Sequence, residues 1–208
     1  MPNLDIFKKK LKEFLNNREP KIIEDRRGAY THSSVLLPLF IKDGQYWILL
    51  IRRADTVKYH GGEISFPGGV VEEGDENLER TAKREAFEEV GISGDDVEIL
   101  GPLDDVSTVT SNFIIHPFIG IVPFPYSFKI NRQEVNHLIE IPLQFFLKSS
   151  HPQPIVIEYK GSDFETPAFE YNGAIIWGAT ERILENLIAL INSVDLFSHQ
   201  DTKSRRKD

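Results

Sequence analysis

Apolar residues recur at helical spacing in two segments, one near each end of the chain. Residues 4–17 place apolar side chains three or four positions apart with lysines between them, and residues 180–191 show the same spacing. We therefore predict an amphipathic N-terminal helix, which packs on its own domain or on a partner subunit, and a closing amphipathic helix. The mostly polar residues 196–208 predict a disordered tail.

The middle of the chain shows the pattern of β-strands. Val35–Ile41 and Tyr46–Arg52 are rich in apolar and β-branched residues, and Asp43-Gly44 between them predicts a hairpin. A short strand at Ile64–Phe66 is predicted to enter a turn at Pro67-Gly68-Gly69. The same reasoning predicts strands at 97–100, 103–108, 114–118, 120–122 and 134–139, and a hairpin of 155–159 with 165–171. A short helix is predicted at 143–147. A strand is predicted to end at Trp177, before a turn and a helix N-cap at Thr180.

A third predicted helix, which begins after Asp75 or Asn77 and ends at Gly91, carries clustered acidic residues. Three glutamates at positions i, i+3 and i+4 project from one face of it: Glu85, Glu88 and Glu89. They form either a solvated acidic surface or a site for a hard cation such as Mg²⁺ or Mn²⁺, which binds carboxylate and phosphate oxygens together. The glycines at 68 and 69, which permit a close approach of the backbone, favour the metal site.

The segment from Gly69 to Ile92 resembles the box of the Nudix hydrolases, G-x5-E-x7-R-E-U-x-E-E-x-G-U, in which U is apolar. The matching positions are Gly69, Arg84, Glu85, Glu88, Glu89, Gly91 and Ile92. The spacing differs from the box. With five residues between it and Gly69, the glutamate position is Asp75, and eight residues instead of seven then separate it from Arg84. Counted back from Arg84 instead, the glutamate position is Glu76, and Val70 stands where glycine is expected. The loop is therefore one residue longer than in the general box.

A longer turn with an aspartate is a feature of one branch of this family, the coenzyme A pyrophosphatases. Upstream, residues 49–54 (LLIRRA) and 58–69 (KYHGGEISFPGG) resemble the branch patterns L-L-x-x-R-S and R-x-H-x-G-x-[VI]-x-F-P-G-G, with Lys58 in place of arginine. Downstream, residues 103–108 (LDDVST) and 176–180 (IWGAT) resemble later landmarks of the branch. The resemblance covers about residues 30 to 190, which is most of the chain.

The resemblance implies an α+β protein with the Nudix fold, an α/β/α sandwich with a central mixed β-sheet. Residues 28–195 would form the Nudix hydrolase domain, preceded by the N-terminal helix and lead-in at 1–27. The implied reaction is hydrolysis of a diphosphate that joins a nucleoside to another group, with one to three Mg²⁺ or Mn²⁺ ions lowering the pKa of the attacking water. The implied metal ligands are Glu85 and Glu89, then Glu88, with the backbone carbonyl of Gly69.

Other residues are expected to support the chemistry. By analogy with the family, Arg84 points away from the metal face and orients a carboxylate through a fork of hydrogen bonds. The candidates for the general base are Glu88 and Glu134, with Glu140 as a third choice, although Glu134 is equally compatible with a surface glutamate. The 3′-phosphate of coenzyme A requires a cationic pocket, and the nearest basic cluster in the sequence is Arg52, Arg53, Lys58 and His60. For Arg53 the alternative is an exposed salt bridge, and for His60 it is a cap on the turn.

The resemblance therefore predicts metal-dependent hydrolysis of coenzyme A or its derivatives to 3′,5′-ADP and 4′-phosphopantetheine. One alternative is an ADP-ribose or dinucleotide (NADH-type) pyrophosphatase. Another is a non-catalytic Nudix ligand-sensing domain, but such domains often lose box glutamates, and this chain has all three.

The composition of the chain limits the classes of partner that it can bind. With 208 residues, 40% hydrophobic and 27% charged, the chain predicts one globular domain. A net charge of −8 argues against a nucleic-acid-binding surface, and no apolar run is long enough to span a membrane. The absence of cysteine excludes disulfides and a cysteine nucleophile. We expect a cytoplasmic enzyme whose partner is a nucleoside-diphosphate-linked small molecule, and a homodimer is compatible with the resemblance.

Overall fold

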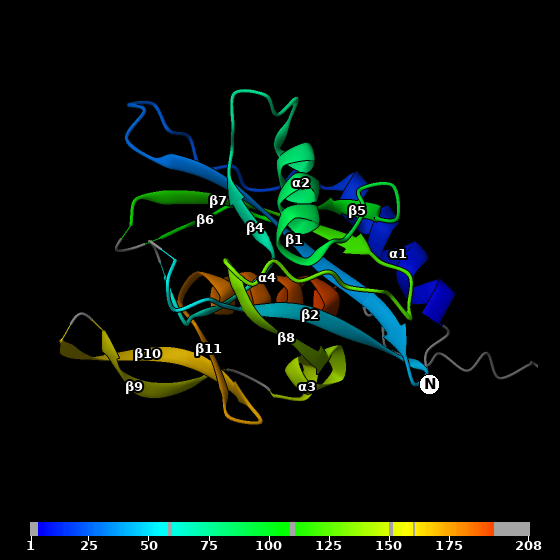
Figure 1. Ribbon diagram of the computed structural model, residues 1–208. Coiled ribbons are helices and arrows are strands. Elements are labelled where there is room, and N and C mark those ends of the chain that lie inside the picture. The colour runs from blue at the N-terminus through cyan, green and yellow to red at the C-terminus, as the bar shows by residue number, and fades with distance from the viewer. Residues whose placement is uncertain (1–3, 58–59, 109–110, 150–151, 160, 194–208) are drawn as a thin grey trace, which may run out of the picture.

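The computed structural model describes residues 4–57, 60–108, 111–149, 152–159 and 161–193 (Figure 1). In chain order, its elements are α1 (Leu4–Asn17), β1 (Thr31–Lys42), β2 (Gln45–Arg53), β3 (Ile64–Ser65), β4 (Gly68–Val70), α2 (Leu78–Val90), β5 (Glu98–Pro102), β6 (Val106–Ser107), β7 (Phe113–Ile121), β8 (Val135–Pro142), α3 (Leu143–Lys148), β9 (Gln153–Tyr159), β10 (Ser162–Tyr171), β11 (Ala174–Trp177) and α4 (Gly178–Ser193).

The central sheet is mixed. Its strands follow the order β3-β2-β1-β7-β5, with β4 paired to β1, β6 to β7 and β8 to β2. Strands β1 and β7 run parallel, whereas β1 and β2 form the predicted antiparallel hairpin. The loop of that hairpin is short because Asp43 and Gly44 both adopt positive φ, which aspartate and glycine tolerate.

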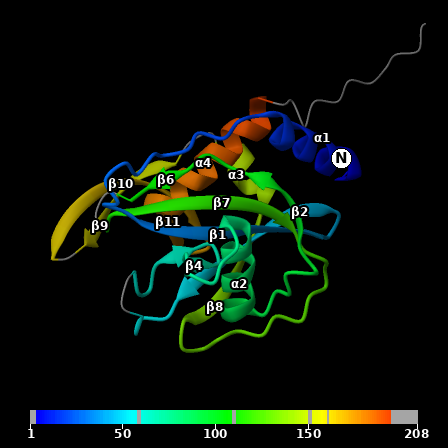
Figure 2. The same ribbon diagram turned by 90° about the horizontal axis from the view of Figure 1, so that it is seen from above.

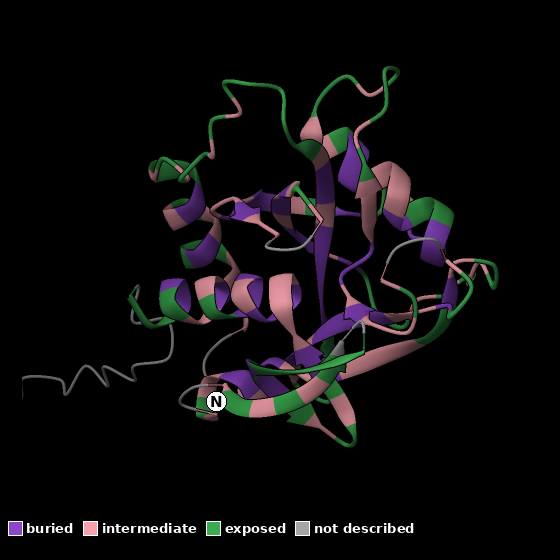
Figure 3. Ribbon diagram, turned by 90° about the vertical axis from the view of Figure 1, so that its left-hand side faces the viewer, coloured by how far each residue is buried: buried purple, intermediate pink, exposed green. Residues whose placement is uncertain are grey.

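Helices cover both faces of this sheet. Alternate residues of β1 point to opposite faces, so Leu37 and Leu39 pack with α1 and α4, while Leu36 and Phe40 pack against α2. Figure 2 shows α2 on one side of β1 and β7, with α1, α3 and α4 on the other. Figure 3 shows the buried residues gathered in the sheet and on the helix faces that lie against it. The predicted α/β/α sandwich with a central mixed sheet is confirmed.

The N-terminal helix packs on its own domain. Phe7, Leu11 and Leu15 of α1 are buried in the core. Lys8 and Lys12 on the same helix form ion pairs with the carboxylate of Glu98 at 3.1 and 2.8 Å. Of the two predicted positions for this helix, the structure shows the one within the domain.

Two aspartates that resembled a branch landmark hold the chain segment after α1. Asp104 accepts from the Arg18 side chain at 2.5 Å and from the backbone N–H of Lys21 at 3.1 Å. Asp105 accepts from the backbone N–H of Ile23 at 2.9 Å and bonds to His116 at 2.7 Å. These residues therefore fix the lead-in to the sheet.

A second, three-stranded sheet has the order β11-β10-β9 and includes the predicted hairpin of β9 with β10. Its inner residues Phe169 and Ile176 are buried in the same cluster as Leu184 and Leu187 of α4. The sheet therefore packs beside the closing helix, and β9 and β10 extend away from the central sheet (Figure 1).

Three local predictions are wrong. Residues 68–70 form strand β4 on β1 instead of a turn. Residues 114–122 are not two strands, because Gly120 continues β7, where an added Cβ would lie 2.6 Å from Cγ1 of Val97. Thr180 does not cap α4; the helix begins at Gly178, and the Thr180 hydroxyl donates to the carbonyl of Ile64 at 3.0 Å.

The predicted tail at 196–208 lies outside the described residues. Within the described ranges, every helix is too short or too polar to cross a lipid bilayer.

Candidate active site

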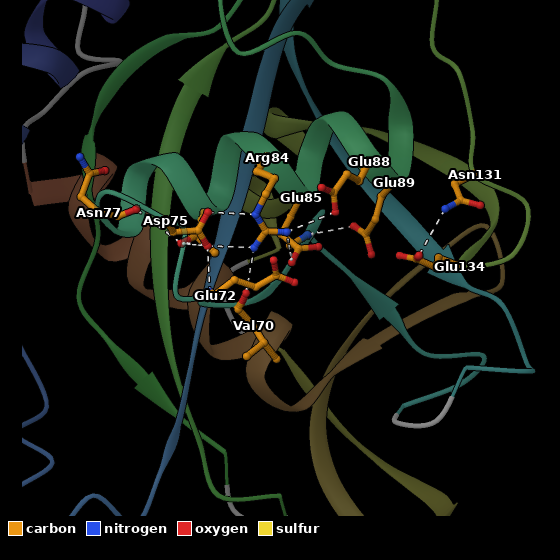
Figure 4. Close-up of polar contacts among 12 residues, drawn as sticks. Val70, Glu72, Asp75, Asn77, Arg84, Glu85, Glu88, Glu89, Asn131 and Glu134 are labelled. Atoms are coloured by element: carbon orange, nitrogen blue, oxygen red, sulfur yellow. Dashed lines mark hydrogen bonds and ion pairs between the residues drawn. The ribbon is translucent and has the colours of Figure 1, made fainter.

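The acidic cluster is presented by α2. Asn77 caps this helix by accepting from the backbone N–H of Arg80 at 2.9 Å, and Gly91 ends it in the left-handed conformation at φ 73°. Its apolar residues Ala82, Ala86 and Val90 pack on the sheet, which fixes the rotation of the helix about its axis. The three predicted glutamates, Glu85, Glu88 and Glu89, therefore lie together along the adjoining face (Figure 4).

Strand β4 brings its backbone against two of these glutamates. An added Cβ on Gly69 would lie 2.4 Å from the carboxyl carbon of Glu85, so only glycine leaves room for that carboxylate. The backbone N–H of Gly68 donates to Oε2 of Glu89 at 2.9 Å. The two glycines are needed for close approach, as predicted, but not for a turn. Gly69 lies beside the cluster, and its carbonyl stays a predicted metal ligand.

Arg84 joins the cluster to the preceding loop. Its Nε and Nη2 each donate to an oxygen of Asp75 at 2.9 Å, which is a fork of hydrogen bonds. Its Nη1 donates to Glu85 at 2.9 Å and to Glu88 at 3.2 Å (Figure 4). The predicted fork is present, but Arg84 also bonds to two of the predicted metal ligands, so the prediction that it points away from the metal face is wrong.

Asp75 lies in the loop before α2, in place of the box glutamate. Asp75 does not cap α2; its carboxylate receives the Arg84 fork, the hydroxyl of Thr81 at 2.9 Å and the backbone N–H of Glu72 at 2.9 Å. The Arg84 guanidinium, followed by these donors, holds the pKa of Asp75 well below its ordinary value. Asp75 therefore remains ionised and keeps the Arg84 side chain in place.

Glu89 is the most deeply buried of the three glutamates, with 1% of its surface exposed. Burial raises its pKa to about 8, and the negative charges of Glu85 and Glu134 act in the same direction. Nη1 of Arg53, at 3.3 Å from Oε1 of Glu89, and the Gly68 N–H oppose this shift. Burial also raises the pKa of Glu85, against the influence of Arg84. Charge on these two carboxylates is therefore costly until a cation balances it.

Glu134 comes to the same site from a distant part of the chain. It lies directly before β8, and its charge acts on both Glu85 and Glu89. Figure 4 shows its carboxylate on the side of the cluster next to Glu89. Asn131 donates from Nδ2 to Oε1 of Glu134 at 3.3 Å. The sequence prediction included Glu134 but not Asn131.

The cluster contains more acidic groups than basic ones. Its carboxyl groups belong to Asp75, Glu85, Glu88, Glu89 and Glu134, and its guanidinium groups to Arg53 and Arg84. Anionic oxygens in excess and close to a glycine backbone are the donor set that Mg²⁺ or Mn²⁺ prefers. The residues therefore fit a divalent cation.

The arginines hold these carboxylates in the arrangement described. Among the described residues, no three His, Asp or Glu side chains are grouped as ligands of one ion. The glutamates are directed toward arginines instead of toward one another, because Arg84 bonds to Glu85 and Glu88 and Arg53 bonds to Glu89. The side chain of Glu88 is 50% exposed, so it can turn toward an ion at little cost.

The members of the predicted basic cluster that the structure describes, Arg52, Arg53 and His60, are not assembled as one pocket. Successive residues of a strand point to opposite faces, and Arg53 reaches Glu89, whereas Arg52 bonds to the Gly62 carbonyl at 3.3 Å. The ring of His60 bonds to Glu63 at 3.0 Å and to the hydroxyl of Ser111 at 3.3 Å, so it links two loops. Lys58 lies outside the described residues.

Comparisons with known proteins give the family context. Residues 30–139 match the family model of the NUDIX domain. A protein of Enterobacter sp. (strain 638), named "Uncharacterized Nudix hydrolase NudL", is 36% identical over 171 residues, which cover 81% of this chain and 86% of that protein. A protein of the same name from Klebsiella pneumoniae is 31% identical over 191 residues, 92% of this chain and 96% of that protein.

Among solved structures, a MutT/nudix family protein from Enterococcus faecalis is similar with a TM-score of 0.54 and 13% identity. The similarity covers 91% of this chain and 70% of that one. It shows that the two proteins share a fold.

Proposed function

Because the chain belongs to the Nudix hydrolase family, we propose that it cleaves the diphosphate of coenzyme A or its derivatives to 3′,5′-ADP and 4′-phosphopantetheine. The observation that carries the proposal is the acidic cluster of α2, in which Glu85 and Glu89 are partly or fully buried beside the backbone of β4. The coenzyme A branch is supported by the sequence around the acidic cluster, in which Asp75 takes the place of the box glutamate and anchors Arg84.

In this mechanism, Glu85, Glu88 and Glu89 would hold Mg²⁺ or Mn²⁺, with the Gly69 carbonyl as a further ligand. The bound cation would neutralise the diphosphate and favour ionisation of a water molecule. Arg84 keeps the carboxylates of Glu85 and Glu88 in place through Nη1, while Asp75 prevents the guanidinium from moving into the site.

The proton of the attacking water requires an acceptor. Among the candidates, Glu88 bonds to Arg84, and Glu134 bonds to a neutral amide. Glu140 forms an ion pair with Lys42 at 2.5 Å, away from the cluster. Glu88 would also hold the metal, and a carboxylate that coordinates a cation has fewer lone pairs to take up a proton, so Glu134 is the better candidate. The water oxygen would form a bond to one phosphorus as the bridging P–O bond breaks, and its proton would pass to Glu134.

A substrate panel tests the proposal. The wild-type enzyme and Glu89→Gln are assayed with coenzyme A, dephospho-coenzyme A, ADP-ribose and NADH, with and without Mg²⁺ or Mn²⁺, and products are identified by mass spectrometry. We expect cleavage of coenzyme A in the presence of metal, and a rate loss of roughly 10²-fold or more in Glu89→Gln. Cleavage of ADP-ribose or NADH with coenzyme A untouched would show that the branch assignment is wrong.

The same panel tests how the 3′-phosphate is bound. Of the described basic residues in the predicted cluster, Arg52 has a side chain that is 41% exposed and weakly bonded to Asp55 at 3.5 Å, so its guanidinium can turn to a phosphate. We expect Arg52→Ala to raise KM for coenzyme A and to leave KM for dephospho-coenzyme A, which lacks that phosphate, unchanged. An equal change for both substrates would exclude Arg52 from this role.

A further inference from the structure

Asn131 has hydrogen bonds on every polar group of its backbone and side chain. Its backbone N–H donates to the carbonyl of Glu89 at 2.9 Å, and its carbonyl accepts from the N–H groups of Glu134 at 3.1 Å and Val135 at 2.8 Å. Because Glu89 lies in the last turn of α2 and Val135 begins β8, these bonds join the end of the acidic helix to the start of the strand.

The side chain of Asn131 has a defined orientation. Oδ1 accepts from the backbone N–H of Gln133 at 3.1 Å, and an N–H can donate only to the amide oxygen. The NH₂ group therefore occupies the other end of the amide, where it donates to Oε1 of Glu134 at 3.3 Å. Figure 4 shows this amide reaching the Glu134 carboxylate from the side opposite the glutamates of α2.

Glu134 needs such a partner. Its charge acts on Glu85 and Glu89, and like charges repel, so an unrestrained carboxylate at this position would turn toward water. The neutral amide of Asn131 fixes the carboxylate by donating to Oε1, and the lone pairs of Oε2 then remain to accept a proton.

We propose that Asn131 is a positioning residue that holds the Glu134 carboxylate at the acidic face of α2, where it accepts a proton from the attacking water. This inference rests on the proposed function. In the step, the water oxygen bonds to phosphorus, its proton passes to Glu134, and the bridging oxygen leaves with the electron pair of the broken P–O bond. Asn131 touches neither substrate nor water and acts through Glu134 alone.

A double-mutant cycle tests this dependence. We expect Glu134→Gln to lower kcat roughly 10²-fold or more, and Asn131→Ala to lower it about 10-fold with KM nearly unchanged. If Asn131 acts only through Glu134, the double variant is no slower than Glu134→Gln. Asn136→Ala, the same substitution at an exposed position of β8, is the matched control and keeps wild-type kcat.

Asn131→Asp separates positioning from folding. Aspartate keeps the Oδ1 acceptor for Gln133 and all backbone bonds, but it replaces the donor to Glu134 with a second negative charge. We expect its kcat to be lower than that of Asn131→Ala, at an unchanged melting temperature. A structural role would lower the melting temperature first and leave kcat of the folded fraction intact, which would overturn the inference.

Other outcomes are equally decisive. Wild-type kcat in Asn131→Ala, or losses that multiply in the double variant, overturn the inference. Wild-type kcat in Glu134→Gln also overturns it, but leaves the proposed function standing.

If the wild type cleaves no substrate of the panel, the proposed function fails. The positioning role of Asn131 is then tested by the affinity of each variant for Mn²⁺, measured by water proton relaxation. A carboxylate held at the cluster attracts Mn²⁺, so we expect Glu134→Gln to bind Mn²⁺ more weakly than wild type and Asn131→Ala to show a smaller loss of affinity. If the double variant binds Mn²⁺ no more weakly than Glu134→Gln, the inference is supported. Equal affinities overturn it.

Discussion

Gly69 lacks a side chain, and the Glu85 carboxylate occupies the space that a side chain would take. An added Cβ would lie 2.4 Å from the Glu85 carboxyl carbon, while the backbone of Gly69 does not have positive φ. Gly69→Ala should therefore displace Glu85 without straining the backbone, and we expect kcat to fall roughly 10²-fold or more, as for the loss of a catalytic electrostatic contact. Steady-state kinetics with saturating Mg²⁺ measure this change.

Gly74 provides a matched control for this substitution. It lies in the loop that follows β4, has no atom within 4 Å of an added Cβ, and has an ordinary φ. Gly74→Ala should keep wild-type kcat, and both variants should keep wild-type far-UV circular dichroism. Equal activity of Gly69→Ala and Gly74→Ala would mean that the position of Glu85 is unimportant for catalysis.

Single residues also show where sequence reasoning succeeds. The helical period placed Glu85, Glu88 and Glu89 on one face, because positions three and four apart on a helix are neighbours. Arg52 and Arg53 were predicted to share one pocket because they are adjacent in sequence, and this was wrong. Side chains of a strand alternate between its two faces, so the strand pattern could have indicated that the two arginines point in different directions. Asn131 had no sequence signal, because its role depends on where the chain returns to the end of α2.

Elements were predictable where their own residues determine them. The amphipathic helices α1 and α4, the capped helix α2 and the β1–β2 hairpin each have a strong local pattern, and each is confirmed. Strand β4 was missed because it has only three residues, two of them glycines, and exists only through its pairing with β1. Tertiary pairing therefore decided the elements with the weakest local signal.

Helix α4 carries a buried acidic residue that makes folding depend on pH. Glu181 is 2% exposed, and burial, together with the adjacent Glu185, raises its pKa to about 8. In the unfolded chain this carboxyl ionises near its ordinary pKa of 4.5, so between about pH 4.5 and 8 the folded state binds more protons. Stability contributed by protonated Glu181 is therefore lost as the pH rises through this range.

Glu181→Gln should remove this dependence. We expect the variant to melt several degrees above wild type at pH 8.5, with the difference closing as the pH falls toward 4.5, since 1 kcal/mol shifts Tm by about 2–4 °C in a chain of this size. Differential scanning calorimetry across this range gives the comparison. Glu170→Gln, the same change at an exposed position of β10, is the control, and a pH-independent difference for Glu181→Gln would refute the assignment.

At the scale of the whole molecule, folding and metal binding depend on different parts of the structure. One apolar cluster lies between the sheet and helices α1 and α4, and a second lies between the sheet and α2. Neither cluster needs a metal, so we expect a chelator to abolish turnover while the circular dichroism spectrum stays native. The excess negative charge at α2 destabilises this metal-free state.

Mn²⁺ should therefore stabilise the fold by binding the native state alone. At a free concentration of 100 Kd, such binding contributes about 2.7 kcal/mol, which corresponds to several degrees in Tm. NaCl of matched ionic strength controls for screening of the net charge of −8, which acts over the whole surface. A protein with Glu85, Glu88 and Glu89 all changed to Gln should respond alike to both salts. If wild type does the same, the carboxylates of α2 do not form a metal site, because specific coordination would distinguish Mn²⁺ from Na⁺.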